Sequence, residues 1–442
     1  MSILSTETTE LQGKRQPENV RVDPRSVLEY IEKSPAAGAG GKRTDKRRTM
    51  HDQFSSEILT RARDLFPHLK QGKIYLNHAG TSPLSTRVVE SMTAYLRRRS
   101  EGDLDTYQND LGMVAECRTG VSRLIRAESS DRIAFQSNTS DAINVIAAGI
   151  PWKTGDRILL GDIEFPANIY PYLNLKPIGV ELDFISAPDG RLTAELIAAR
   201  IGQHTRLVAL SAVQFLSGHR SDLRSIGSLC RNNGTIFAVD GIQAVGAVRI
   251  DVQKMCIDAL SAGAQKWQMG PHGSGFLYLT EELQSRIRQK NLGWLSVENP
   301  WDFYNYEQPL ASSARRYEGG SLNMPSLWGM REAIGTLIEF GPDGIESHIL
   351  AITSRLIERL MKIDGVTLFS PLPEGERAGI VTISLVPPLD PRTVFDKLRE
   401  RGVTIAIREG KLRYSPHFYN SADDMDRVAD MTGEVIREAH GG

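Results

Sequence analysis

The chain has 442 residues, of which 40% are hydrophobic and 24% are charged, an ordinary composition for a folded soluble protein. Its net charge of −1 gives no overall attraction for nucleic acid or an anionic membrane, and no hydrophobic run approaches the roughly 18–20 residues of a membrane span. No positive flank precedes an apolar stretch at the N-terminus, so we expect no secretory signal. Three widely spaced cysteines without a CxxC pair indicate a reduced, cytoplasmic setting.

Residues 1–50 have the composition of a disordered tail. Residues 34–41 are linker-like, and residues 42–48 form a basic run. The run is either an electrostatic arm or a solvated tail, and we favour the second interpretation. A short helix at 24–33 is only weakly indicated.

The next segment combines helical and extended patterns. An amphipathic stretch at 54–69 leads into a strand at 73–80 that ends in a turn. Apolar residues recur with helical spacing over 85–99, and Ser85 is a candidate N-cap.

The middle of the chain alternates short apolar strands with helices, which predicts an α/β domain with a mostly parallel sheet covered on both faces. The expected strands are residues 132–136, 157–160, 180–185, 207–213, 235–239, 259–261 and 275–279. The expected helices include residues 193–201, 223–232 and one that opens in the turn 137–141 and ends near Gly149.

The pattern changes after about residue 320, where we expect a smaller α+β domain. Its predicted elements are helices at 325–340, 347–361, 390–402 and 421–439, a strand at 379–386, and a hairpin of 402–408 with 411–415. The expected divisions are an N-terminal segment at 51–90, a large domain at 91–320 and a small domain at 321–442.

Two residues point to cofactor chemistry. Asp240 ends an apolar strand, and ligands of open α/β sheets bind at the carboxyl ends of the strands. A buried carboxylate needs a cationic partner, which a protonated pyridine ring supplies. Lys266 follows among small residues, and burial favours the unprotonated amine that an imine requires. Alone, Asp240 could be a cap and Lys266 a surface lysine; together they predict a pyridoxal phosphate (PLP) site.

Two further stretches suit the phosphate of this cofactor. Residues 137–141 present hydroxyls and free backbone N–H groups where a strand meets a helix. Thr139 could equally be a simple helix cap. Residues 315–321 are basic and hydroxyl-bearing and could complete the anion site.

From about residue 73 to the C-terminus, the chain resembles the class-V aminotransferases, the fold-type I branch that includes cysteine desulfurases, selenocysteine lyases and isopenicillin N epimerases. The motifs that carry the resemblance, in order, are YLNHAG at 75–80, SNT at 137–139, VDGIQAVG at 239–246, QKW at 265–267, GPHGSG at 270–275, YEGGS at 317–321 and LRYSPHFYN at 412–420. The resemblance implies a fold-type I PLP-dependent transferase with a seven-stranded sheet.

The resemblance also implies a role for each matching residue. Lys266 would form the Schiff base and move protons, Asp240 would pair with the pyridine nitrogen, and Arg413 would bind the substrate carboxylate. The phosphate would contact Asn138, Thr139 and Gln265, together with Ser321 from the partner subunit of a homodimer. The ring hydroxyl would lie near Gln243 and Gln214, and the substrate would contact Asn77 and His78.

Several positions depart from the family pattern. Phe165 stands where many relatives stack a histidine on the ring, so it could stack but could not transfer a proton. Gln265 replaces a histidine, and Gly263 replaces a serine. No cysteine follows Cys256, whereas a cysteine desulfurase needs a nucleophilic cysteine in its C-terminal third. We therefore expect no persulfide relay.

The residues do not select one reaction, because the bond that breaks depends on geometry. We rank amino transfer of an amino-acid-like substrate first. A C–S or β-eliminating lyase and an amino-acid epimerase are the alternatives. A non-catalytic PLP-binding regulator is a further class, but the N-terminal extension lacks a convincing DNA-binding helix-turn-helix. No metal site is expected.

Overall fold

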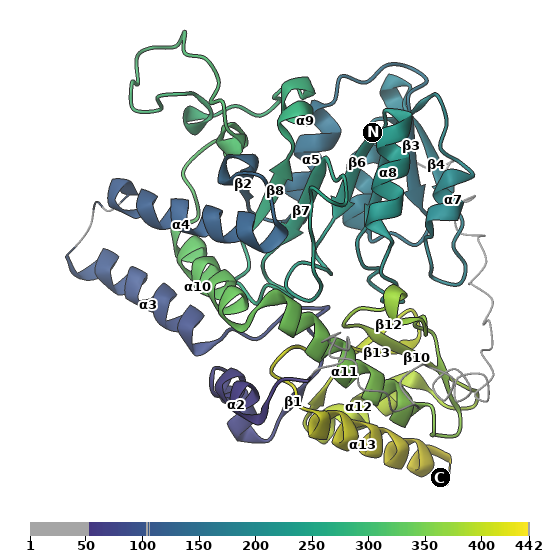
Figure 1. The fold of residues 1–442 in the computed structure, drawn as a ribbon. Coiled ribbons are helices and arrows are strands. Elements are labelled where there is room, and N and C mark those ends of the chain that lie inside the picture. Colours follow the sequence, from purple (N-terminus) through teal and green to yellow (C-terminus); the bar gives the residue numbers. More distant parts are fainter. Residues whose placement is uncertain (1–52, 103–104, 106, 441–442) are drawn as a thin grey trace, which may run out of the picture.

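The structure is a computed structural model that describes residues 53–102, 105 and 107–440 (Figure 1). The predicted tail at 1–50 and its short helix lie outside the described residues. The described chain forms a large α/β unit and a smaller α+β unit, as the sequence predicts (Figure 1).

The large unit is built on one seven-stranded sheet with the order β2-β8-β7-β6-β5-β3-β4. The pairs that involve β8 are antiparallel and the other neighbours are parallel, so the predicted mostly parallel sheet is confirmed. Its strands are β2 (Ile133–Gln136), β3 (Arg157–Gly161), β4 (Glu181–Ile185), β5 (Thr205–Ser211), β6 (Ile236–Asp240), β7 (Ala259–Gly263) and β8 (Gly275–Leu279).

Helices cover both faces of this sheet, which explains why β6, β7 and β8 are buried along their whole length. The helices of the first two-thirds of the described chain are α2 (Ser56–Asp64), α3 (Thr86–Glu101), α4 (Tyr107–Ile125), α5 (Thr139–Gly149), α6 (Tyr170–Leu173), α7 (Ala194–Ala198), α8 (Leu223–Asn233) and α9 (Glu281–Arg286).

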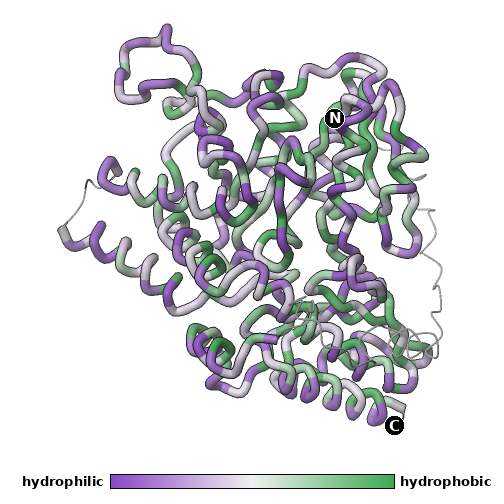
Figure 2. The backbone as a smooth tube through the Cα atoms, viewed as in Figure 1, coloured by the Kyte–Doolittle hydropathy of each residue, from purple (hydrophilic) through white to green (hydrophobic). Residues whose placement is uncertain are grey.

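The small unit contains a four-stranded antiparallel sheet with the order β12-β13-β10-β9. Its strands are β9 (Val366–Leu368), β10 (Val381–Leu385), β11 (Val403–Thr404), β12 (Ala406–Arg408) and β13 (Lys411–Tyr414), and its helices are α11 (Pro342–Leu360), α12 (Pro391–Glu400) and α13 (Ala422–His440). Hydrophilic and hydrophobic residues alternate along α13, as Figure 2 shows, because one side of the helix covers this sheet.

The expected division near residue 90 falls inside α3, so it does not follow the elements of the fold. The preceding strand β1 (Ile74–Tyr75) pairs in parallel with β11, and Ile74 and Leu76 belong to the hydrophobic core of the small unit. The segment before α3 therefore crosses to the C-terminal part of the chain. Helix α10 (Met324–Phe340) packs against α3 and α4 and leads into α11.

Side-chain caps explain where several helices begin. Ser85 accepts a hydrogen bond from the Val88 N–H, as predicted, and Asp390 caps α12. Helix α11 begins five residues before the predicted start, with Pro342 in its first turn. Helix α4 was not predicted, because glycines and polar residues interrupt its apolar pattern.

Two glycines inside helices should respond oppositely to substitution. A Cβ at Gly227 in α8 would collide with the Met255 carbonyl, whereas a Cβ at Gly335 in α10 meets open space. We expect Gly227→Ala to destabilise the protein by about 1–3 kcal/mol through overpacking. Gly335→Ala should stabilise it by about 0.5–1 kcal/mol through better helix propensity. Thermal unfolding of both variants checks this; equal shifts of the melting temperature would contradict it.

Candidate active site

The carboxyl ends of β5, β6 and β7 meet at one edge of the large sheet. Asp240, the last residue of β6, lies beside Ser211 of β5 and Ser261 of β7 in the strand register. Its side chain is buried, and one carboxylate oxygen accepts a hydrogen bond from the Ile242 N–H at 2.9 Å. Burial raises the pKa of Asp240 to about 7, and the negative charge of Glu164 adds to this shift. The Ile242 N–H and the positive charge of Lys266 oppose it.

Lys266 follows β7 at the same edge. Burial lowers the pKa of its amine to about 8. The charge of Asp240 opposes this shift, while those of Arg413 and Arg408 add to it. The Lys266 Nζ atom lies 5.5 Å from the centre of the Phe165 ring. Burial therefore favours the unprotonated amine, which is the form that attacks a carbonyl.

The residues at this edge fit a polar, ring-shaped cofactor such as PLP. Among the described residues, Asp240 forms no ion pair, although its carboxylate is buried. The Gln214 Oε1, Ser261 Oγ and Arg413 Nε atoms are also buried and lack hydrogen-bond partners. Buried polar groups without partners are costly, so these atoms favour a bound polar ligand. Asp240 would hold the pyridinium of bound PLP, and Lys266 would hold its carbonyl carbon.

Glu164 is a residue of this site to which the sequence analysis assigned no role. Its buried carboxylate accepts hydrogen bonds from the Ser211 N–H and Oγ, the Gln214 Nε2 and the Asn168 Nδ2. These bonds fix the orientation of the Gln214 amide, whose Oε1 is left without a partner. The position of Glu164 shortly after a buried strand, directly before Phe165, was the available sequence signal.

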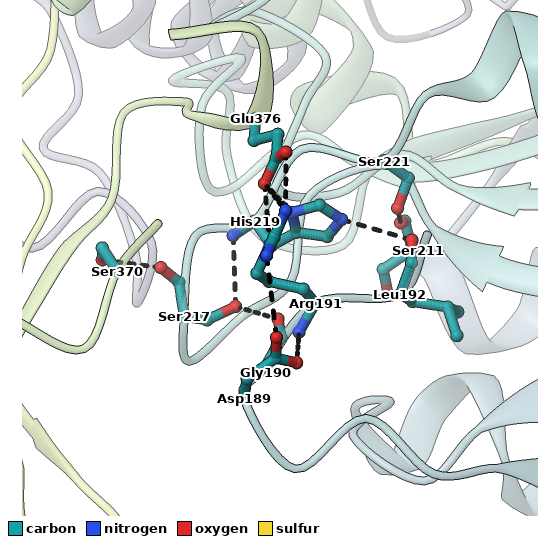
Figure 3. Close-up of polar contacts among 10 residues, drawn as sticks. All are labelled: Asp189, Gly190, Arg191, Leu192, Ser211, Ser217, His219, Ser221, Ser370 and Glu376. Atoms are coloured by element: carbon teal, nitrogen blue, oxygen red, sulfur yellow. Dashed lines mark hydrogen bonds and ion pairs between the residues drawn. The ribbon is translucent and has the colours of Figure 1, made fainter. Parts of the chain in front are cut away.

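The loop that carries Gln214 is held by the small unit. The Arg413 Nη1 donates to the Phe215 carbonyl, the Thr382 Oγ1 to the Leu216 carbonyl and the Ser370 Oγ to the Ser217 carbonyl, all at 2.6 Å. Figure 3 shows the last of these contacts beside the Ser217 hydroxyl, which donates to the Gly190 carbonyl. Gln214 is therefore anchored from both units.

A second group of contacts secures the end of this loop (Figure 3). His219 is buried, and its Nε2 lies 3.2 Å from the Leu192 carbonyl oxygen. Burial lowers the pKa of His219, so the ring is neutral at physiological pH. Glu376 of the small unit forms a bidentate pair with Arg191 at 2.7 Å, and its carbonyl accepts from the Arg220 N–H. This network joins the two units at the side of the site.

The residues expected at the phosphate lie close to the same edge. Asn138 caps α5 by accepting from the Asp141 N–H, and the Thr139 Oγ1 accepts from the Gly263 N–H at 2.9 Å. The N-terminus of α5 therefore contacts the end of β7, where free backbone N–H groups suit an anion. Ser321 is exposed beside a small pocket of about 110 Å³ that Ser137 also lines. Phosphate binding by these residues stays a prediction.

The two departures near the lysine are linked. A Cβ at Gly263 would collide with the Gln265 side chain, so the glycine leaves the space that this side chain occupies. The Gln265 carbonyl accepts from the Ser82 N–H and the Thr81 Oγ1, which fixes the backbone next to Lys266. The position of the Gln265 side chain therefore depends on the glycine at 263.

The residues expected near the ring hydroxyl and the substrate differ in how many hydrogen bonds their side chains make within the protein. Gln243 donates to the Ala79 carbonyl and accepts from the Trp267 Nε1, which fixes the orientation of its amide. His78 is fully buried, and its ring nitrogens contact the Ser415 carbonyl and the Tyr419 hydroxyl. Contact of Gln243 with the cofactor and of His78 with the substrate stays a prediction. Asn77 retains an Oδ1 atom that is buried without a partner.

Phe165 and Arg413 complete the site. Phe165 is 42% exposed and packs edge-to-face on Phe215 with ring centres 5.3 Å apart, so one side of its ring is open for stacking. Arg413 lies on β13 and is 2% exposed. Burial lowers its pKa to about 10, and the charge of Arg408 adds to the shift. A carboxylate would offset the cost of this buried charge.

Comparisons with known proteins agree with this geometry. The model of the family described as aminotransferase class-V matches residues 74–427. A probable cysteine desulfurase of Methanothermobacter thermautotrophicus is 27% identical over 396 residues, which cover 84% of this chain and 96% of the relative. The apo structure of a cysteine desulfurase from Thermococcus onnurineus NA1 has a TM-score of 0.78 at 25% identity, covering 88% of this chain and 100% of that chain. The cystine C–S lyase C-DES shares the fold, with a TM-score of 0.76 at 23% identity over 84% and 99% of the two chains.

Within the described residues, no group of three or more His, Cys, Asp or Glu side chains is placed to hold a metal ion. The described helices include none that is both long enough and apolar enough to cross a bilayer.

Replacing Glu164 should weaken cofactor binding. Glu164→Gln keeps the shape of the side chain but replaces one carboxylate oxygen by an NH₂ group. The donors that bond this oxygen in the native protein would then face another donor, and each such mismatch costs about 1–3 kcal/mol. We expect a higher dissociation constant for PLP and a lower melting temperature. The exposed residue Glu181 on β4 provides the control Glu181→Gln, which should leave both values unchanged. An E164Q variant with wild-type PLP affinity would contradict this role.

The lowered pKa of Lys266 predicts how the apoprotein takes up PLP. Only the unprotonated amine attacks the carbonyl, so the attachment rate should rise with pH through about 8 and then level off. Stopped-flow absorbance at a series of pH values measures this rate. A rate that levels off only near roughly 10.4, the value of an ordinary lysine, would contradict the site described.

Proposed function

The chain belongs to the class-V aminotransferase family and is a PLP-dependent enzyme, and from this premise we propose that it is a lyase that cleaves a C–S bond of a sulfur-containing amino acid by β-elimination. We further propose that the sulfur leaves with the product and never resides on an enzyme cysteine. The balanced reaction of R–S–CH₂–CH(NH₃⁺)–COO⁻ with water gives R–SH, pyruvate and ammonium.

The names of the relatives support the lyase alternative over the amino transfer that the sequence analysis ranked first. The relative of 27% identity, which matches over 84% of this chain, is named a probable cysteine desulfurase, a protein that acts on a C–S bond. The structure of a protein with the same activity in its title matches over 88% of the chain. Retention of both Lys266 and Asp240 supports a catalytic protein over a binding-only regulator.

The side chains around the site can perform the proton transfers of an elimination. When bound, PLP draws electron density from the bonds to the α-carbon of the amino acid. The Lys266 Nζ, with its pKa lowered to about 8 by burial, can accept the α-proton and return it to the departing sulfur. Asp240 would hold the positive charge on the ring nitrogen, and Arg413 would hold the substrate carboxylate. Phe165 supplies no proton, so these transfers rest on Lys266.

The positions of the cysteines support the proposal that the sulfur never resides on an enzyme cysteine. Cys117 and Cys230 are buried, and burial raises the pKa of each thiol to about 12. Cys256 is partly exposed but precedes β7, whereas Lys266 follows that strand. A five-residue strand spans roughly 17 Å, so this thiol lies at the opposite end of the sheet from the amine. No cysteine of the sequence follows it.

We also propose an oligomeric state and a cellular location for the enzyme. The first is a homodimer in which Ser321 reaches the phosphate of the partner's site, supported by the exposure of Ser321 and by the exposed aromatic side chains of Phe303, Tyr304 and Tyr306 in the preceding loop. The second is the cytoplasm, supported by three cysteines that form no disulfide.

Incubation of the PLP-loaded enzyme with cysteine, cystine and S-alkylcysteines tests the reaction. We expect pyruvate, ammonia and the matching sulfur product (hydrogen sulfide from cysteine, a persulfide from cystine, a thiol from an S-alkylcysteine) in equal amounts from at least one of them, and no product with Lys266→Ala. Formation of a 2-oxo acid only when a second oxo acid accepts the amino group would indicate amino transfer. Inverted stereochemistry without bond cleavage would indicate an epimerase. Either outcome would contradict the proposal.

Alkylation of the native enzyme tests the absence of a sulfur relay. Iodoacetamide should modify Cys256 and leave the activity unchanged, because the raised pKa values of Cys117 and Cys230 keep those thiols protonated. The variant Cys256→Ser should likewise retain kcat. Loss of activity in proportion to the modification of one cysteine would show that a thiol takes part.

A further inference from the structure

Three cationic side chains lie on one face of the β12–β13 hairpin. In its register Ala406 is opposite Arg413, and Arg408 is opposite Lys411. Paired residues share a face of a sheet, as do alternate residues of a strand. Arg408, Lys411 and Arg413 therefore form a row on one face, which we call the cationic face.

Hydrogen bonds join the sheet that carries the cationic face to the large unit. Arg413 donates to the Phe215 carbonyl, and Thr382, which is opposite Arg413 on β10, donates to the Leu216 carbonyl. After burial, the positive charge of Arg408 is a cause of the lowered pKa of Arg413, and it also lowers that of Lys266. Arg408 is thus electrostatically coupled to both.

Carboxylates do not neutralise the cationic face. Within the described part of the chain, none of Arg408, Lys411 and Arg413 forms an ion pair with an acidic side chain, although many surface arginines do. The Lys411 Nζ lies 4.8 Å from the centre of the Phe369 ring, and the Arg413 Nε is buried without a partner. Like charges gathered without counter-charge disfavour the ionised state, so the arrangement is suited to anions.

One substrate carboxylate does not use the whole face. A carboxylate has two oxygens and is satisfied by a single bidentate guanidinium, here that of the buried Arg413. Arg408 is exposed and Lys411 is partly exposed, so both are accessible from outside the site. They extend the row beyond the position of the α-carboxylate.

We propose that the site selects amino acids that carry a second anionic group on the side chain, with Arg413 binding the α-carboxylate and Arg408 and Lys411 binding the distal anion. A carboxylate or an oxyanion of sulfur at that position has the required chemistry. The substrate class rests on the proposed function, because it presumes that an amino acid reacts at Lys266. The preference for a dianion is a property of the binding face and can be measured without turnover.

Binding of unreactive four-carbon acids to the PLP-loaded enzyme tests the preference. Succinate carries two carboxylates and butyrate one, and neither has the amine needed to react. Isothermal titration calorimetry should give a dissociation constant for succinate that is lower by roughly tenfold or more, since a charge-assisted hydrogen bond adds this much. Equal affinities, or no measurable succinate binding, would overturn the proposal.

Variants locate the second anion site. Arg408→Gln should reduce the preference for succinate to within about twofold, and Lys411→Gln should reduce it in part. Arg392→Gln, at an exposed arginine of α12 paired with Asp396, is the matched control and should keep the full preference. A variant Arg408→Gln with unchanged preference would remove this residue from the site.

Kinetics extends the test to substrates. S-carboxymethylcysteine and S-isobutylcysteine have side chains of similar shape that differ in charge. We expect kcat/KM to favour the first by roughly tenfold, and Arg408→Gln to remove this advantage through KM with little change in kcat. Absence of turnover with both would count against the proposed function, while the calorimetry would still decide the charge preference. Equal kcat/KM for the two substrates would overturn the proposal.

Discussion

Asp240, Glu164 and Lys266 are buried ionisable groups near the carboxyl edge of the large sheet, and the cost of burying them governs the surrounding structure. Burial raises the pKa of Asp240 and lowers that of Lys266, so the apoprotein favours the less charged state of each. A pyridinium ring would reverse the first effect by supplying the missing positive charge. Glu164 is stabilised differently, by four hydrogen-bond donors.

The small unit has a direct part in this arrangement. Its side chains hold the loop that presents Gln214, and its hairpin brings Arg413 and Arg408 to the lysine. Strand β1 crosses from the N-terminal segment to pair with β11, so the chain before α3 also braces this unit. A shift of the hairpin would therefore change substrate binding and the orientation of the Gln214 amide together.

Local patterns in the sequence predicted the parts of the fold that depend on local physics. Short apolar runs correctly identified the seven strands of the large sheet, and Asp240 appeared at a strand end because that strand is buried along its length. Ser85 was recognised as a cap because its hydroxyl directly precedes a run of apolar residues with helical spacing. The pairing of Ile74 with Val403 was not predictable, because it joins segments more than 300 residues apart through only two residues.

The roles of side chains were harder to predict than the elements that carry them. The pattern placed Gln243 and His78 in motifs of the site, and the structure adds their hydrogen bonds to Trp267 and Tyr419, which the sequence did not predict. Glu164 looked like an ordinary residue beside Phe165, because its four donors come from three separate positions. The link between Gly263 and Gln265 likewise became visible only when the space above the glycine was known.

Identification of the lysine that binds PLP tests the central claim most directly. Reduction of the loaded enzyme with sodium borohydride fixes the cofactor to the amine that holds it, and peptide mass spectrometry then locates the phosphopyridoxyl group. The account predicts this group on Lys266, in the peptide that follows β7. Its presence on another lysine, or the absence of a modified peptide, would contradict the account.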